Sequence, residues 1–142
     1  DADIIVIGPG SLYTSIIANL IIPDISEAII NSRAKKVFIC NIMSEEGETD
    51  RLDCYGHLEK ITDHVKNLKI DYMLINNKII ESDILERYDR EHKHPVYVDD
   101  SQRAKIRELG VQIIEDNLLR VSETGQIMHD SEKVARILLD IL

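Results

Sequence analysis

The most distinctive chemical feature of the sequence is a loop of small residues near its amino end. An apolar run, Ile4–Ile7, leads directly into two glycines, Gly8 and Gly10, that flank Pro9. The glycines let the backbone turn sharply and let a ligand approach it, while Pro9 stiffens the turn. Ser11 is suited to cap a helix whose first amides face a phosphate, with nearby hydroxyls as further donors. The candidate phosphate-binding residues are Gly8, Pro9, Gly10, Ser11, Leu12, Tyr13, Thr14 and Ser15.

This loop does not identify a nucleotide site by itself. Gly8–Ser11 matches neither the P-loop pattern nor the six-residue dinucleotide fingerprint. Every α/β protein needs tight turns between strands and helices, so a plain turn and an anion site are about equally favoured by these residues.

Polar residues follow several of the apolar runs that we predict to be strands. They are Asn41, Asn76–Asn77 and Asp99–Asp100, and Asn41 is followed by a long polar segment, Ile42–Asp50. The carboxyl ends of parallel strands share one edge, where ligands usually bind. Asn and Asp also favour turns and helix caps, and Asp99 or Asp100 before Ser101 suits a cap. Asn41 with its long loop is therefore the stronger binding candidate.

The remaining chemically active side chains give weaker signals. Cys54, His57 and His64 share a predicted helix, but a zinc site needs more convergent ligands than these. The charged run 88–93 is typical of a solvated helix face, and His129–Asp130 is placed to cap the last helix. No nucleophile is assigned, because catalytic triads are recognised by geometry rather than by spacing.

Strand and helix patterns alternate along the chain and predict the scaffold for these groups. The predicted strands are Ile4–Ile7, Val37–Asn41, Tyr72–Ile75, Val96–Val98 and Val111–Ile114. Helical patterns lie between them, one with capping-box spacing from Asp24 to Glu27, another ending at Gly110, and a last one follows Asp130. The segment 116–129 suits a hairpin around Thr124-Gly125. This order predicts a mainly parallel α/β sheet with helices on both faces and one domain over residues 1–142.

Composition narrows the classes of partner. The 142 residues carry a formal charge of −9, with 44% hydrophobic and 30% charged residues. An acidic chain argues against nucleic acid, whereas a helix amino terminus holds phosphate without Lys or Arg. No apolar run is long enough to cross a membrane and no signal peptide is visible, so we expect a cytoplasmic protein. The chain begins at Asp1 without Met, which suggests a fragment.

The motifs now described resemble those of one family, the gluconeogenesis factors and 2-phospho-L-lactate transferases (YvcK/CofD-like). Ala2–Ser15 resembles the family's hallmark segment. Asn41-Ile42-Met43 followed by Gly47-Glu48-Thr49-Asp50 resembles its second motif, and His57 stands where the family has a histidine. The family's order continues through Ile70–Asn77, Tyr88, Pro95–Asp99 and His129–Asp130.

The resemblance implies a three-layer Rossmann-like fold and a nucleotide ligand. The more similar branch contains bacterial gluconeogenesis factors that bind UDP-N-acetylglucosamine and are needed for cell shape, with no established reaction. We therefore expect a regulatory nucleotide-sugar-binding protein. The residues that the resemblance places on the nucleotide are Gly8–Ser15, Asn41, Gly47, Glu48 and Thr49, with Asp50, His57, Asn76 and Asp99 behind them.

Two alternatives remain open. The other branch transfers a phospholactyl group from a guanosine diphosphate donor, with Mg²⁺ that Glu48, Asp50 or Asp99 would hold. Family members are about twice this long, so the resemblance also makes this chain the carboxyl-terminal half of the domain. A non-binding structural half-domain, with an exposed sheet edge that pairs into a homo-oligomer, is the third reading. Ser44-Glu45-Glu46 replaces the Thr-Gln-Pro that the gluconeogenesis factors usually have before Gly-Glu-Thr, so the resemblance does not fix the ligand contacts of these three residues.

Overall fold

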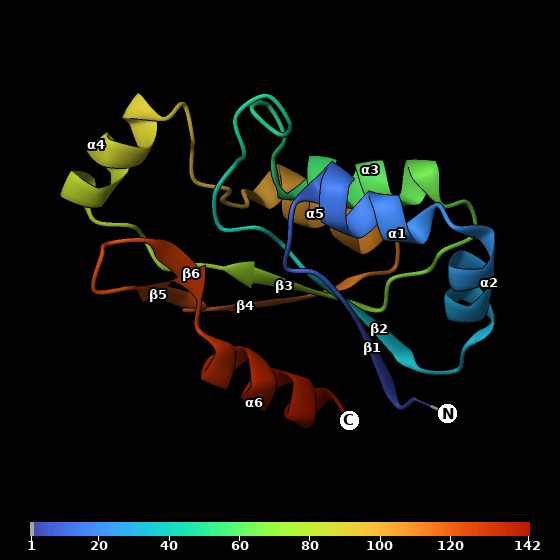
Figure 1. Ribbon diagram of the computed structural model, residues 1–142. Helices are drawn as coiled ribbons and strands as arrows, with labels where there is room; N and C mark the ends of the chain where they lie inside the picture. The colour runs from blue at the N-terminus through green and yellow to red at the C-terminus, as the bar shows by residue number, and fades with distance from the viewer. Residues whose placement is uncertain (1) are drawn as a thin grey trace.

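The computed structural model describes residues 2–142, which are organised around a four-stranded parallel sheet (Figure 1). The strands are β1 (Ile4–Ile7), β2 (Lys35–Ile39), β3 (Tyr72–Asn76) and β4 (Gln112–Asp116). They lie side by side in that order, and all three pairings are parallel. The predicted parallel α/β sheet is confirmed.

Helices cover both faces of this sheet, which gives the predicted three layers (Figure 1). The helices are η1 (Leu12–Ile17), α1 (Ala18–Leu20), α2 (Pro23–Asn31), α3 (Cys54–His64), α4 (Ser82–Arg90), α5 (Asp100–Glu108) and α6 (Ser131–Ile141). η1, α1, α3 and α5 lie on one face, and α6 lies on the other with a hairpin of β5 (Leu119–Val121) and β6 (Ile127–His129). The hairpin predicted within 116–129 is therefore present, with β5 and β6 antiparallel.

The two-sided sheet explains why its central strands are apolar without alternation. Successive side chains of a strand point to opposite faces. Phe38 and Met73 therefore pack under α3 and α5, whereas Val37 and Leu74 pack against α6. Each fully buried apolar side chain of this kind contributes about 2 kcal/mol relative to exposure.

One predicted strand, Val96–Val98, is not part of the sheet. The segment is extended, but its partner is the loop after β2: the amide of Val96 donates to the carbonyl of Ile42 at 2.9 Å, and Pro95 forms an isolated bridge with Met43. Periodicity alone does not distinguish an extended loop from a strand. Asp99 consequently does not stand at the carboxyl edge of a strand.

Side-chain caps begin three of the helices as the sequence predicts. Ser11, Asp99 and Asp130 each accept a hydrogen bond from an amide in the first turn of η1, α5 and α6. The capping box predicted at Asp24 is wrong, because α2 begins with Pro23 at its first position and its N-cap is Ile22. Proline supplies the helical φ angle there without needing a capping side chain.

The outer strands of the sheet and the lengths of the helices bear on the expected pairing of copies and on the expected lack of a membrane-spanning segment. β1 and β4 are the outer strands, so pairing of copies through an edge stays a prediction. Over the described part of the chain, no single helix has both the length and the apolar character required to span a membrane.

Candidate functional site

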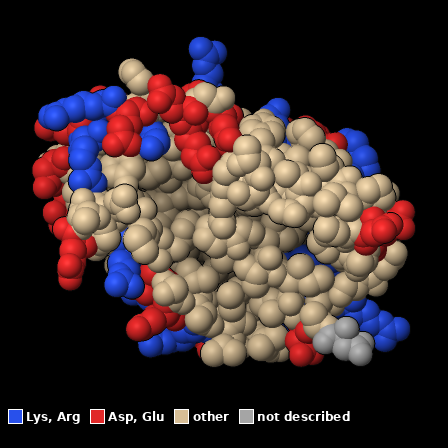
Figure 2. Space-filling view, viewed as in Figure 1, with Lys and Arg blue, Asp and Glu red and all other residues tan. Residues whose placement is uncertain are grey.

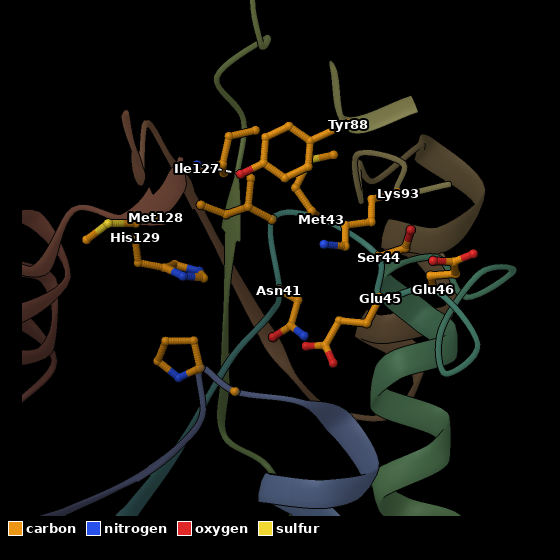
Figure 3. Close-up of a pocket in the computed structure, with 13 residues that line it drawn as sticks. Asn41, Met43, Ser44, Glu45, Glu46, Tyr88, Lys93, Ile127, Met128 and His129 are labelled. Atoms are coloured by element: carbon orange, nitrogen blue, oxygen red, sulfur yellow. Dashed lines mark hydrogen bonds between the residues drawn. The ribbon is translucent and has the colours of Figure 1, made fainter. Parts of the chain in front are cut away.

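A cleft of about 740 Å³ opens at the carboxyl ends of β1 and β2 (Figure 3). It lies between the glycine loop, the loop after β2, strand β6 and the end of α4. Its lining residues are Pro9, Gly10, Asn41, Ile42, Met43, Ser44, Glu45, Glu46, Tyr88, Lys93, Ile127, Met128 and His129. Figure 2 shows Asp and Glu side chains gathered together with Lys and Arg side chains at the upper left of the molecule, while most of the surface toward the right is uncharged. The position is the one that the sequence predicts for a ligand site in a parallel sheet.

The glycine loop is pressed against β2, and this contact requires glycine. Gly8 has φ +84°, and a Cβ atom there would lie 3.0 Å from the carbonyl oxygen of Ile39. Residues with a side chain rarely adopt that φ angle, and the backbone carbonyl of Ile39 cannot move aside as a flexible side chain would. The turn at Gly8 brings Pro9 and Gly10 to the wall of the cleft.

Ser11 links the glycine loop to the loop after β2. Its hydroxyl donates to the carboxylate of Glu48 at 2.7 Å and accepts from the amide and the hydroxyl of Thr14, at 3.3 and 2.6 Å. The predicted capping role of Ser11 is thus confirmed. The amide of Thr14, which was predicted to face a phosphate, already donates its hydrogen bond to the Ser11 hydroxyl.

The other residues of the predicted phosphate loop point away from the cleft. Leu12 is buried in the core below η1. The ring of Tyr13 packs edge-on against His64, with the ring centroids 6.2 Å apart. Ser15 lines a separate hollow of about 310 Å³ beside β1. Of the eight predicted loop residues, the structure brings Pro9 and Gly10 to the cleft.

The loop after β2 places Asn41 in the cleft and folds the residues that follow into one tight turn. Asn41 is 9% exposed, and its amide points into the cleft in Figure 3. The amides of Glu48 and Thr49 both donate to the carbonyl of Glu45, at 3.1 and 2.9 Å. Thr49 is buried and its hydroxyl accepts from the amide of Glu45 at 2.8 Å, so its side chain holds the turn. Gly47, at φ +76°, closes the turn.

This turn sets Glu45 and Glu48 on the same side, three residues apart. Burial raises the pKa of the Glu45 carboxyl above its ordinary value, and the neighbouring Glu48 carboxyl raises it further. Ser11 and Lys93 act in the opposite direction on the pKa of Glu45. The carboxyl of Glu45, which lines the cleft, therefore sits close to a second carboxyl, Glu48, behind the lining.

Three residues that pattern reasoning placed elsewhere also line the cleft: Tyr88, Lys93 and His129. The prediction that the run 88–93 is only a solvated face is wrong for Tyr88 and Lys93. The hydroxyl of Tyr88 accepts a hydrogen bond from the amide of Ile127 at 2.7 Å, which ties α4 to the hairpin. No local pattern indicates this contact, since the two residues are 39 positions apart.

His129 does not cap α6; Asp130 does. The Nε2 atom of His129 lies 3.0 Å from the carbonyl oxygen of Cys40, so Nε2 carries the hydrogen and Nδ1 is left as an acceptor. Burial lowers the pKa of His129, which keeps the ring neutral at pH 7.

The residues predicted behind the nucleotide do not converge on one point. Asp50 accepts from the amide of Gly47 at 2.9 Å, and Asp99 caps α5. Asn76 is buried and bonds to Lys78 and to the amide of Leu118. These side chains organise turns in different parts of the rim.

His57 is buried inside α3, at 1% exposure. Its Nδ1 atom lies 2.8 Å from the carbonyl oxygen of Asp53, and its Nε2 atom has no partner among the described residues. Burial lowers the pKa of His57. It does not line the cleft.

The carboxylates that the transferase alternative assigns to Mg²⁺ are not arranged to hold the ion by protein side chains alone. Glu48 is bonded to Ser11, Asp50 to Gly47 and Asp99 to Gln102. Within residues 2–142 no group of three or more His, Cys, Asp or Glu side chains is arranged to hold a metal ion.

Comparisons with known proteins agree with the motifs. A family model described as "2-phospho-L-lactate transferase CofD" matches residues 1–119. The chain is 39% identical over 142 residues to a gluconeogenesis factor of Bacillus subtilis strain 168, covering 100% of this chain and 44% of that protein. It is 40% identical over 139 residues to a gluconeogenesis factor of Halalkalibacterium halodurans, covering 98% of this chain and 42% of that protein.

A solved structure agrees in fold. A crystal structure of a UPF0052-family protein from Bacillus halodurans has a TM-score of 0.89 at 40% identity, over 97% of this chain and 43% of that one. The chain thus spans less than half the length of the relatives it matches.

Proposed function

Because the chain belongs to the family of CofD and the gluconeogenesis factors, we propose that its cleft binds a nucleotide sugar of the UDP-N-acetylglucosamine kind. The role is regulatory rather than catalytic, and the protein acts in the cytoplasm. The observation that carries the proposal is the cleft itself, which combines the family's two motifs at the carboxyl ends of β1 and β2.

The size and position of the cleft support a ligand of this class. Small-molecule sites range over about 300–1,000 Å³ and lie at the carboxyl ends of parallel strands. At about 740 Å³, the cleft has room for a nucleoside, a diphosphate and part of a sugar.

The chemistry of the lining supports the same ligand. Gly10 lets phosphate approach the backbone, and Lys93 supplies an ammonium group within the cleft. The Asn41 amide both donates and accepts hydrogen bonds, as recognition of a base or an N-acetyl group requires. Tyr88 adds an aromatic ring that its bond to Ile127 holds in place.

The test is calorimetric titration of the protein in its natural length, and of the 142-residue chain, with UDP-N-acetylglucosamine. We expect micromolar binding that weakens about tenfold in Lys93→Met, because the diphosphate loses its cation. Lys66→Met removes the same charge from an exposed turn just after α3 and serves as the matched control. Equal weakening by both substitutions would place the ligand outside this cleft.

The same titrations separate the other readings. Binding of GDP only with Mg²⁺, together with release of GMP from a guanosine diphosphate donor, would favour the transferase branch. No binding of either nucleotide by either form of the protein would overturn the proposal and leave the structural role.

A further inference from the structure

The charges that line the cleft are unusual for a site that takes a diphosphate. Among the described residues, its charged lining consists of Glu45, Glu46 and Lys93. Lys93 is also paired, with its Nζ atom 2.8 Å from the carboxylate of Glu91. A highly charged anion in this cleft therefore meets more negative than positive side chains.

Glu45 is the acid best placed to meet the ligand. In Figure 3 its carboxylate points into the cleft beside Asn41, whereas Glu46 lies at the edge. The turn that carries Glu45 is fixed by the bond from its amide to Thr49 and by the two amides that donate to its carbonyl. The side chain is thus presented from a rigid segment.

Glu45 and Glu48 compete for the hydroxyl of Ser11, which also acts to lower the pKa of Glu45. The hydroxyl of Ser11 is committed to Glu48 at 2.7 Å and receives both donors of Thr14. The carboxylate oxygens of Glu45 are therefore available to hydroxyl groups of a ligand, which are good donors to a carboxylate.

We propose that Glu45 selects for an esterified diphosphate, as in a nucleotide sugar, over a free nucleoside diphosphate. This inference rests on the proposed function and names the ligand's chemistry at that site. A sugar on the terminal phosphate removes one negative charge and presents hydroxyls to the Glu45 carboxylate. A free terminal phosphate carries the extra charge and is repelled by it.

The test compares UDP-N-acetylglucosamine with UDP by calorimetry at pH 8, in the wild type and in Glu45→Gln. The amide keeps the size of the side chain and removes its charge. We expect the wild type to prefer the nucleotide sugar. In Glu45→Gln, UDP binds about fivefold to tenfold more tightly, as loss of one charge repulsion in a partly exposed cleft predicts. Affinity for the nucleotide sugar falls or stays the same, so the ratio of the two affinities collapses.

Glu86→Gln is the matched control, since it makes the same change on an exposed position of α4 outside the cleft. Its affinity ratio stays within about twofold of the wild type, because a solvent-exposed charge is screened. Thermal unfolding of each variant checks that the fold is kept.

The outcomes separate this inference from the function on which it rests. If the wild type binds the nucleotide sugar and Glu45→Gln leaves the ratio of its affinities for UDP-N-acetylglucosamine and UDP unchanged, the selectivity role of Glu45 is wrong and the proposed function stands. An equal change of ratio in Glu86→Gln also overturns it. Wild type that binds neither ligand overturns both.

Discussion

Replacing Gly8 by alanine tests whether the glycine loop is held against β2 as the structure describes. Gly8 and Gly110 have nearly the same backbone conformation, at φ +84° and +81°. A Cβ atom at Gly8 meets the carbonyl of Ile39 at 3.0 Å and a methyl of Ile16 at 3.2 Å, whereas at Gly110 nothing lies within 4 Å. The pair therefore separates the cost of the φ angle from the cost of the close contact.

The magnitude follows from these two terms. A positive φ costs an alanine about 1–2 kcal/mol, and this applies to both positions. Crowding of a well-packed site adds about 1–3 kcal/mol, and this applies only to Gly8→Ala. We expect Gly8→Ala to lower the free energy of unfolding by about 2–5 kcal/mol and Gly110→Ala by about 1–2 kcal/mol.

The assay is urea unfolding of both variants followed by circular dichroism, with the melting temperature as a second measure. For a domain of this size, 1 kcal/mol corresponds to a shift in melting temperature of about 3–4 °C. Gly8→Ala should also weaken nucleotide binding, because Pro9 and Gly10 follow the turn into the cleft. If Gly8→Ala costs no more than Gly110→Ala, the contact between the loop and β2 is not as described.

Two further predictions concern the pH dependence of stability. Arg103 binds both carboxylate oxygens of Glu115, at 2.7 and 2.8 Å, and this lowers the pKa of Glu115. The stabilisation from this ion pair is therefore fully present above pH 4.5, the pKa of an unfolded Glu, and is lost as pH falls through the folded pKa of Glu115. In urea titrations, Glu115→Gln should lower the free energy of unfolding by about 1 kcal/mol at pH 7 and by little at pH 3. Burial lowers the pKa of His57 below its ordinary value of 6.5. As pH falls below 6.5, the unfolded chain therefore binds a proton at His57 before the folded chain does, and the free energy of unfolding decreases. His57→Gln should flatten the slope of unfolding free energy between pH 7 and 5, and an unchanged slope would show that His57 is not the group responsible.

Local sequence determined the elements and several of their ends. The apolar runs at β1, β2, β3 and β4 and the caps Ser11, Asp99 and Asp130 follow from patterns that span a few residues. The order of strands and helices indicates a parallel sheet, because parallel strands need helical crossovers. Gly8 and Gly110 also indicate tight turns from the sequence alone, because glycine is the residue that most readily adopts a positive φ angle.

Which side chains share the cleft depends on long-range packing rather than on local patterns. Tyr88, Lys93 and His129 reach it because α4 and the hairpin fold over the ends of β1 and β2, through contacts between residues far apart in the chain. Thr49 and Asn76, polar residues that suit a ligand site by sequence, are instead used to hold turns. A short pattern records hydrogen bonds and burial within a few residues, whereas a cleft depends on how distant segments pack. For this reason the scaffold and the family motifs can be predicted from local sequence, whereas the presence of Tyr88, Lys93 and His129 in the cleft follows from the packing of distant segments.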